Sequence, residues 1–181
     1  MSTTKIAIRY AKPLLELAEE QGKLENVFSD INGFLAICKS NRDFILMLKS
    51  PIIPHLKKAD ILDKIFKGKV TDLTASFLQI IARKNRESLL PDIASKFIQL
   101  YNNKKGIQEA VVTTSVAIDA KTRKAFEKLI ADVTGKKPSI VEKVDPEIIG
   151  GFVVKLGDQQ IDDSIKGKLK DLELKFQKEK V

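Results

Sequence analysis

A chain of 181 residues, of which 43% are hydrophobic and 31% charged, is long enough for one large domain or two small ones, with a packed core. Its apolar runs fall short of the ~18 consecutive apolar residues that a membrane-spanning helix needs, and its N-terminus lacks the apolar segment of a secretory signal. The single cysteine, Cys38, excludes an internal disulfide. We therefore expect an intracellular protein in a reducing compartment.

The net charge of +8 is concentrated in the first part of the chain. Residues 1–105 carry 18 Lys and Arg against 11 Asp and Glu, whereas residues 106–181 carry 14 against 13. Such an excess indicates an acidic partner, which is a nucleic acid, an anionic membrane surface or an acidic protein. A solvated basic face without a partner explains the composition equally well.

The first part of the chain has the apolar periodicity of helices throughout. Six helices are predicted, at residues 6–20, 24–38, 41–48, 56–66, 71–84 and 88–105. Asn41 (or Ser40), Thr71 and Ser88 stand where helix N-caps are expected, and Pro13 predicts a kink or a restart inside the first helix. Because the connections are short, the six helices are expected to form a compact bundle.

The pattern changes at residue 106, where β-branched residues become frequent. Strands are predicted at residues 108–118, 139–144 and 151–156, with a short fourth strand or a continuation at 158–161. Asp119 is expected to cap a helix over 120–133 that ends at Gly135, and a terminal helix follows Ser164. The predicted fold class is therefore mainly α, with a six-helix bundle over 1–105 and a small α+β domain over 106–181.

Residues that carry out catalysis or bind metals are scarce. The only histidine, His55, follows Pro54 at a helix start, and a single histidine without a neighbouring ligand is a poor metal site. Cys38 lies on an apolar helix face, which favours a buried and unreactive thiol. No Ser, His and Asp set can be assembled. The sequence predicts no catalytic, cofactor or metal site.

The segment over residues 145–164 contains several turn signals. Gly150 and Gly151 lack the surrounding pattern of a phosphate-binding loop, and they indicate a bulge or a close approach of two backbone segments. Asp158, Asp162 and Asp163 lack the spacing of a calcium loop. A turn followed by a helix cap explains these carboxylates better.

A basic cluster at residues 83–86, with Lys57, Lys58 and 67–69 in support, is the best candidate for binding nucleic acid. No aromatic residue lies within it to stack on bases. Cations at a helix C-terminus, where they complement the helix dipole, are the favoured explanation. A basic helical nucleic-acid-binding protein remains the alternative prediction.

The first and fifth predicted helices carry small residues between their apolar ones. These are Ala7, Ala11 and Ala18 in the first helix and Ala75, Ser76 and Ala82 in the fifth. Small residues allow two helices to approach closely, or leave a groove for a partner helix. From the pattern alone, ordinary packing within the bundle is favoured.

Three stretches together resemble one family. They are residues 9–12 (RYAK) with 15–18 (LELA), residues 77–86 with 89–93 (LLPDI), and residues 149–154 (IGGFVV) with 157–164 (GDQQIDDS). In this order and at this length they are similar to the delta subunits of bacterial-type ATP synthases, relatives of the mitochondrial oligomycin-sensitivity-conferring protein. The chain departs from the family pattern at Pro13 and at Asp163, where glycine is common.

This resemblance implies a non-catalytic stator subunit without a cofactor. It implies that the helical domain receives the N-terminal helix of an alpha subunit in a groove of the first and fifth helices. On this chain, the groove residues would be Tyr10, Ala11, Leu14, Phe77, Ile80 and Ile81. The structural residues of the family signature would be Gly150, Gly151, Gly157, Asp158, Asp162 and Ser164.

The resemblance also implies where the protein works. The C-terminal domain would contact the C-terminal ends of the b subunits in the peripheral stalk, and no nucleic acid is expected as a partner. The protein would lie peripherally at the cytoplasmic face of the bacterial plasma membrane. Its role would be to hold the catalytic head against the torque of the rotor.

Overall fold

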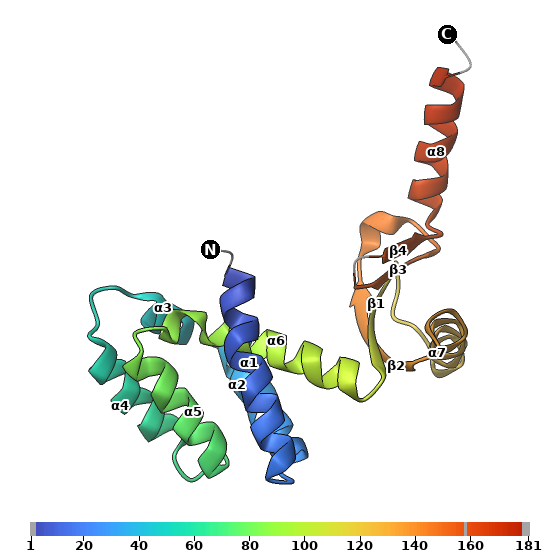
Figure 1. Cartoon of the computed structure of the whole chain (residues 1–181). Helices are drawn as coiled ribbons and strands as arrows, with labels where there is room; N and C mark the ends of the chain where they lie inside the picture. Colours follow the sequence, from blue (N-terminus) through green and yellow to red (C-terminus); the bar gives the residue numbers. More distant parts are fainter. Residues whose placement is uncertain (1–2, 158, 179–181) are drawn as a thin grey trace. The chain divides into compact units, whose positions relative to one another are not determined.

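The computed structural model describes residues 3–157 and 159–178, and the chain forms two compact units, Met1–Tyr101 and Asn102–Val181 (Figure 1). The first unit is helical, and the second combines a sheet with helices. This architecture confirms the predicted fold class, mainly α with a six-helix bundle before a small α+β domain. Each unit has its own core and is described by itself.

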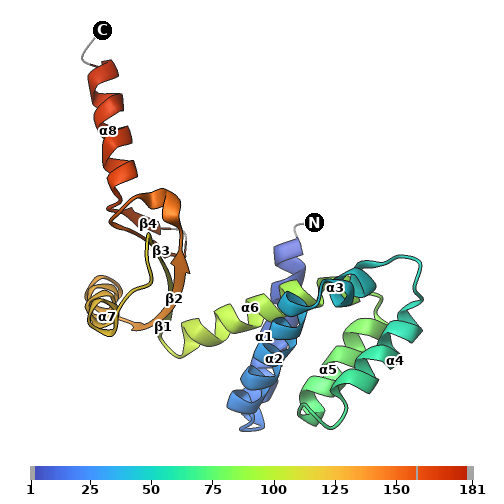
Figure 2. The ribbon, with the colours of Figure 1, turned by 180° about the vertical axis from the view of Figure 1, so that it is seen from behind.

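The six helices of the first unit follow one another with short connections (Figures 1 and 2). They are α1 (Thr3–Glu20), α2 (Leu24–Ser40), α3 (Arg42–Lys49), α4 (His55–Phe66), α5 (Asp72–Arg83) and α6 (Leu90–Lys104), with a 3₁₀ turn η1 (Glu87–Leu89) before α6. Ser88 lies inside this turn, so it does not cap α6 as predicted.

Local side-chain chemistry sets two of the helix starts. The Asn41 side chain accepts a hydrogen bond from the backbone N–H of Phe44 at 3.1 Å, and Thr71 accepts one from Thr74 at 3.3 Å. The predicted restart at Pro13 is wrong, because α1 runs through this residue as one helix. Pro13 and Arg9 are both exposed, so water can reach the carbonyl group that the proline leaves unpaired.

The buried faces of α1 and α5 differ from the faces that their large apolar residues predict. On α1, the alanines at 7, 11 and 18 are fully buried, whereas Leu17 is 41% exposed. On α5, Thr74, Leu78, Ile81 and Ala82 are buried, whereas Ile80 is 52% exposed. Large residues share the buried sides with the alanines, as Leu14 and Leu15 do on α1, whereas Ser76 of α5 is exposed. Each helix therefore keeps a second apolar side that its own unit does not bury.

Phenylalanines hold three of the helices together at the centre of the first unit. Phe34 of α2 packs against Phe44 of α3 and Phe66 of α4, with ring centroids 5.9 and 5.6 Å apart. Phe44 and Phe66 also contact each other at 6.3 Å. Mutual edge-on and tilted contacts of this kind add to the free energy gained from burying the rings.

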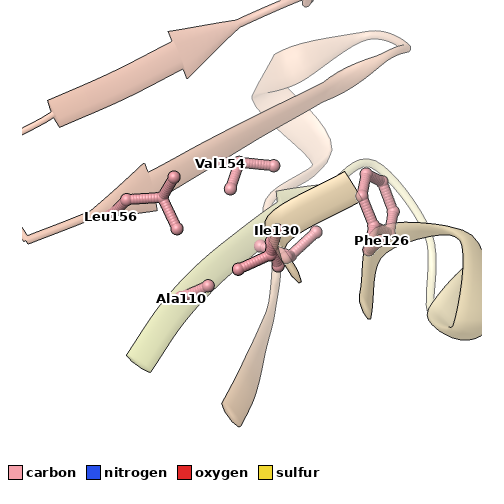
Figure 3. Packing of buried hydrophobic residues seen from close by; sticks show 6 residues of the cluster. Ala110, Phe126, Ile130, Val154 and Leu156 are labelled. Carbon is pink, nitrogen blue, oxygen red and sulfur yellow. The ribbon is translucent and has the colours of Figure 1, made fainter. Parts of the chain in front are cut away.

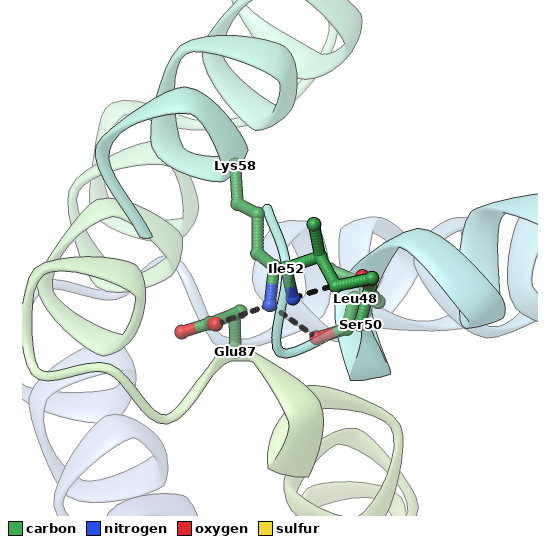
Figure 4. A network of polar contacts seen from close by, with 5 residues as sticks. All are labelled: Leu48, Ser50, Ile52, Lys58 and Glu87. Carbon is green, nitrogen blue, oxygen red and sulfur yellow. Dashed lines mark hydrogen bonds and ion pairs between the residues drawn. The ribbon is translucent and has the colours of Figure 1, made fainter. Parts of the chain in front are cut away.

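A buried ion pair connects three backbone segments in the same unit (Figure 4). The Lys58 Nζ atom donates to Glu87 Oε1 at 2.6 Å and to the Leu48 carbonyl oxygen at 3.0 Å. Both charged side chains are only 3% exposed. Lys58 therefore belongs to the interior, and its predicted contribution to a basic surface is wrong. The reason is a partner 29 residues away that no local pattern reveals.

The second unit contains a four-stranded sheet in the order β2-β1-β3-β4. Its elements are β1 (Ile107–Thr114), α7 (Ala120–Thr134), β2 (Lys137–Val144), the 3₁₀ turn η2 (Pro146–Ile148), β3 (Phe152–Leu156), β4 (Gln159–Asp162) and α8 (Ile165–Lys178). β1 and β2 are parallel and joined by α7, while β3 pairs antiparallel with β1 and β4. β1 ends earlier than predicted, where the Thr114 hydroxyl donates to the Val116 carbonyl at 2.7 Å.

Helix α7 covers one face of this sheet and forms the second core (Figure 3). Phe126 and Ile130 of α7 pack against Ala110 of β1 and against Val154 and Leu156 of β3. The helix begins as predicted, because the Asp119 side chain accepts a hydrogen bond from the Thr122 backbone N–H at 2.8 Å. It ends at a glycine, residue 135, whose φ is 67°.

The Lys58–Glu87 pair generates a stability prediction. Lys58→Met leaves the buried Glu87 carboxylate without its cation, and we expect a loss of roughly 3–5 kcal/mol in the free energy of unfolding. Replacing both residues by Met removes the uncompensated charge and should recover most of that loss. Guanidinium denaturation followed by circular dichroism measures both effects.

Lys57→Met provides the matched control, because Lys57 is the exposed neighbour on the same helix. We expect this control to change stability by less than about 0.5 kcal/mol. A Lys58→Met variant that is no less stable than Lys57→Met would contradict the structural role of the ion pair.

Candidate partner-binding surfaces

The six predicted groove residues divide into two sets in the structure. Ala11, Leu14 and Ile81 are at most 3% exposed and belong to the core of the bundle. Tyr10 and Phe77 are partly exposed and Ile80 is largely exposed. Only the second set can contact a partner directly, while the first set supports it from beneath.

The accessible apolar side chains continue along both helices. We call this set the α1/α5 face, and its members are Ile6, Tyr10 and Leu17 of α1 with Leu73, Phe77 and Ile80 of α5. On each helix the spacing keeps these residues on one side. The sequence pattern alone favoured packing within the bundle for these two helices, and it does not reveal that this side stays exposed.

Tyr10 joins the middle of α1 to the end of α5. The Arg86 guanidinium donates a hydrogen bond to the Tyr10 hydroxyl, and its Cζ atom lies 5.5 Å from the centroid of the tyrosine ring. Asn85 adopts a left-handed conformation with φ 55°, and the Arg86 backbone N–H donates to the Ile81 carbonyl at 3.1 Å. This left-handed helix end turns Arg86 back towards α1.

Two glycines of the predicted signature, Gly150 and Gly151, lie where the start of β3 meets the start of α8. Gly151 has φ +81°, and a Cβ atom there would lie 2.4 Å from the Asp163 carbonyl oxygen. The Asp163 N–H donates to the Phe152 carbonyl at 3.0 Å, and the Ile165 N–H donates to the Gly150 carbonyl at 3.0 Å. The two backbone segments are thus joined on both sides of a contact that only glycine allows.

Asp162 and Ser164 form a hydrogen-bonded cap at the start of α8. Asp162 Oδ1 accepts from the Ser164 hydroxyl at 2.6 Å and from its backbone N–H at 2.9 Å, which lowers the pKa of the Asp162 carboxyl. The Ser164 Oγ atom in turn accepts from the Gly167 N–H at 2.9 Å. Gly157 turns the chain after β3 with φ +59°, and Asp158 lies outside the described residues.

The second unit also exposes apolar residues. On α8, Ile165, Leu169 and Leu172 are 46%, 57% and 48% exposed, and their spacing places them on one side of the helix. Helical spacing from Leu169 and Leu172 would place Phe176 on the same side, but its side chain lies outside the described side chains. A hollow of about 390 Å³ opens at the end of β1 and is lined by Val116, Phe126 and Phe152 among others.

The described residues offer little reactive chemistry. Burial raises the pKa of the Cys38 thiol to about 11, so this group is a protonated thiol at neutral pH. Within residues 3–157 and 159–178, no group of His, Cys, Asp and Glu side chains is arranged to hold a metal ion. Among the same residues, no helix has the length and apolar character needed to cross a membrane.

Comparison with known proteins gives a consistent result over nearly the whole chain. A profile of the ATP synthase delta (OSCP) subunit family matches residues 6–176. The chain belongs to this family. The ATP synthase subunit delta of Cytophaga hutchinsonii is 39% identical over 176 residues, which cover 97% of this chain and 96% of that protein. The subunit of the same name from Chlorobium luteolum is 36% identical over 172 residues, covering 95% of each chain.

A solved structure supports the fold of this family member. It is a chain in the cryo-EM structure of the Toxoplasma gondii mitochondrial ATP synthase hexamer, with a TM-score of 0.76 and 22% sequence identity. The match covers 94% of this chain and 96% of that chain. At this identity the likeness is evidence for the fold alone.

The contact at Gly151 generates a second stability prediction. Gly151→Ala places a Cβ atom against a backbone oxygen and adds the strain of a left-handed alanine, so the second unit should lose roughly 2–4 kcal/mol of stability. Gly135→Ala is the matched control, because its φ is +67° but nothing lies within 4 Å of the added carbon. It should cost only about 1 kcal/mol.

Hydrogen exchange at the amides of β1 and β3 measures the stability of the second unit separately from that of the first. Equal losses in the Gly151→Ala and Gly135→Ala variants would show that backbone conformation alone matters at residue 151. The close approach of β3 to the start of α8 would then not require glycine.

Proposed function

We propose that the chain is the stator subunit that joins the catalytic head of an ATP synthase to its peripheral stalk. The observation that carries the proposal is membership of the delta (OSCP) family over residues 6–176. In this role the protein holds the head still while the rotor turns, so that ion flow is coupled to ATP synthesis. It acts as a structural subunit without an active site of its own.

A stator needs two separate attachments that dissociate slowly under torque. Slow dissociation comes mainly from apolar side chains buried at an interface, and rim charges contribute less to it. Each unit offers such side chains, the α1/α5 face in the first and the α8 residues in the second. We assign residues 1–105 to the head and residues 106–181 to the stalk.

At the head, the partner that we propose is the N-terminal helix of an alpha subunit. An amphipathic helix docks through apolar residues at intervals of three and four, and it needs a complementary apolar surface. Tyr10, Phe77 and Ile80 would contact this helix directly. Ala11, Leu14 and Ile81 would shape the surface from beneath, because they are buried in the bundle.

At the stalk, we propose that the C-terminal ends of the b subunits bind the second unit. Ile165, Leu169 and Leu172 give α8 an exposed apolar side that suits a helical partner. In a bacterial cell this arrangement places the protein at the cytoplasmic face of the plasma membrane, attached through the complex. The comparisons give no support to the alternative of a nucleic-acid-binding protein.

Ile80→Asp tests the attachment to the head. A carboxylate at this position would be buried against the apolar side of the docked helix, so affinity for a synthetic alpha-subunit N-terminal peptide should fall by roughly 10-fold or more. The fold should persist because Ile80 is 52% exposed in the free protein. Isothermal titration calorimetry measures the affinity.

The matched control for the head is Ser95→Asp, which adds the same charge at an exposed position of α6, outside the α1/α5 face. It should leave peptide affinity within about twofold of the unchanged chain. Unchanged affinity in Ile80→Asp would remove Ile80 from the interface.

A Leu169→Gln/Leu172→Gln double variant tests the attachment to the stalk. Removing two apolar anchors should weaken binding to the soluble part of the cognate b subunits by roughly 10-fold or more. Lys170→Gln/Glu173→Gln is the matched control, since both residues are exposed on α8 and both double variants preserve net charge. Equal affinities of the two variants in sedimentation or calorimetry would argue against the α8 assignment.

A further inference from the structure

Five exposed cations gather beside the α1/α5 face. They are Lys5 and Arg9 on α1 with Arg83, Lys84 and Arg86 at the end of α5. Among the described residues none of the five forms an ion pair, although several other lysines of the unit do. Like charges held together without counter-ions raise the local potential and favour an acidic partner.

The fold brings these cations together from positions more than 70 residues apart. α1 and α5 run in opposite directions (Figures 1 and 2), so the first half of α1 lies near the end of α5. The contact between Arg86 and Tyr10 fixes this proximity. We call this region the basic end of the α1/α5 face.

The opposite end of the face differs in charge. There α1 finishes with Glu16, Glu19 and Glu20, and α5 opens with Asp72. Lysines lie near these carboxylates, so this end of the α1/α5 face carries charges of both signs. The face therefore has an apolar stripe along its length and unpaired positive charge at one end only.

We propose that the basic end fixes the direction of the helix that binds the α1/α5 face. Acidic side chains near one terminus of that helix lie over Arg9, Arg83, Lys84 and Arg86, and its apolar side lies along Tyr10, Phe77 and Ile80. This inference rests on the proposed function, in which the helix is the N-terminal helix of an alpha subunit. It adds the chemistry of that helix and its orientation.

The contact with Tyr10 holds the Arg86 side chain in a position from which it can bind a carboxylate. The guanidinium stays planar above the ring and uses one N–H on the hydroxyl, which leaves further N–H groups for a carboxylate. A side chain already held in place loses less conformational entropy when a partner binds. Charge pairs at the edge of an interface chiefly set orientation and association rate, while the apolar stripe sets the residence time.

An acidic helix suits this surface better than a nucleic acid does. Exposed apolar residues, among them Ile80 and Leu17, lie on the same two helices as the cations, and a phosphate backbone would leave them uncovered. Tyr10 is engaged by Arg86, so its ring is not free to stack on a base. Both observations favour a partner that is apolar on one side and acidic at one end.

The test is a double-mutant cycle measured by calorimetry on the full chain. Its protein variants are Arg83→Gln/Lys84→Gln/Arg86→Gln and a control, Lys49→Gln/Lys57→Gln/Lys64→Gln, which removes three exposed cations elsewhere in the same unit. Its probes are the alpha-subunit N-terminal peptide and the same peptide with every Asp and Glu amidated. Two further peptides are amidated only in the N-terminal half or only in the C-terminal half.

We expect the basic-end variant to weaken binding of the native peptide by about 10-fold at ~50 mM salt and by less at ~500 mM. It should have little effect on the fully amidated peptide, because the two changes remove the same interaction. The coupling should be confined to one half of the peptide. The control variant should bind nearly as well as the unchanged chain.

Three other outcomes would show which part of the proposal is wrong. A native peptide that binds no chain overturns the helix-docking assignment and this inference with it. Tight binding that the basic-end variant leaves unchanged, or coupling shared equally by both halves of the peptide, overturns the basic end alone. Loss of duplex DNA binding in that variant, with peptide binding intact, would assign the cluster to nucleic acid.

Discussion

The packing of the buried sides of α1 and α5 is the constraint on which the exposed α1/α5 face depends. Ala7, Ala11 and Ala18 of α1 are buried together with Leu14 and Leu15. Leu17, on another side of the same helix, stays 41% exposed. On α5, Leu78, Ile81 and Ala82 are buried, whereas Ile80 is 52% exposed. Apolar surface available to a partner is thus a consequence of tight internal packing.

In the second unit, the absence of a side chain at Gly151 determines how closely two backbone segments pack. Gly151 allows the backbone of β3 to meet the residues that precede α8, and hydrogen bonds on both sides hold the two segments together. The cap formed by Asp162 and Ser164 then begins the helix at a defined place. An apolar side chain such as Leu169, which is 57% exposed, is therefore presented from a fixed starting point.

The comparison of sequence with structure shows which information is local. Helix caps such as Asn41 and Asp119 were predictable because each acts on a backbone group three residues away. The buried face of α5 was not predictable from the sequence. Two neighbouring rows of apolar residues both follow the helical period, and only tertiary packing decides which row is buried. The burial of Lys58 depends on Glu87, and the position of Tyr10 depends on Arg86, 76 residues further along the chain. Such pairs have no signature in a single sequence.

Lys58 and Arg86 of the first unit differ in burial and in pairing. The buried cation contributes to the stability of the bundle, whereas the exposed cation is accessible to a partner. Lys58 is buried and paired, so its charge is cancelled inside the bundle and contributes nothing to the outer field. Arg86 is exposed and bonded to a neutral hydroxyl, so its charge remains available at the surface. Cys38, the one thiol, is also buried and protonated, so its sulfur is not presented at the surface.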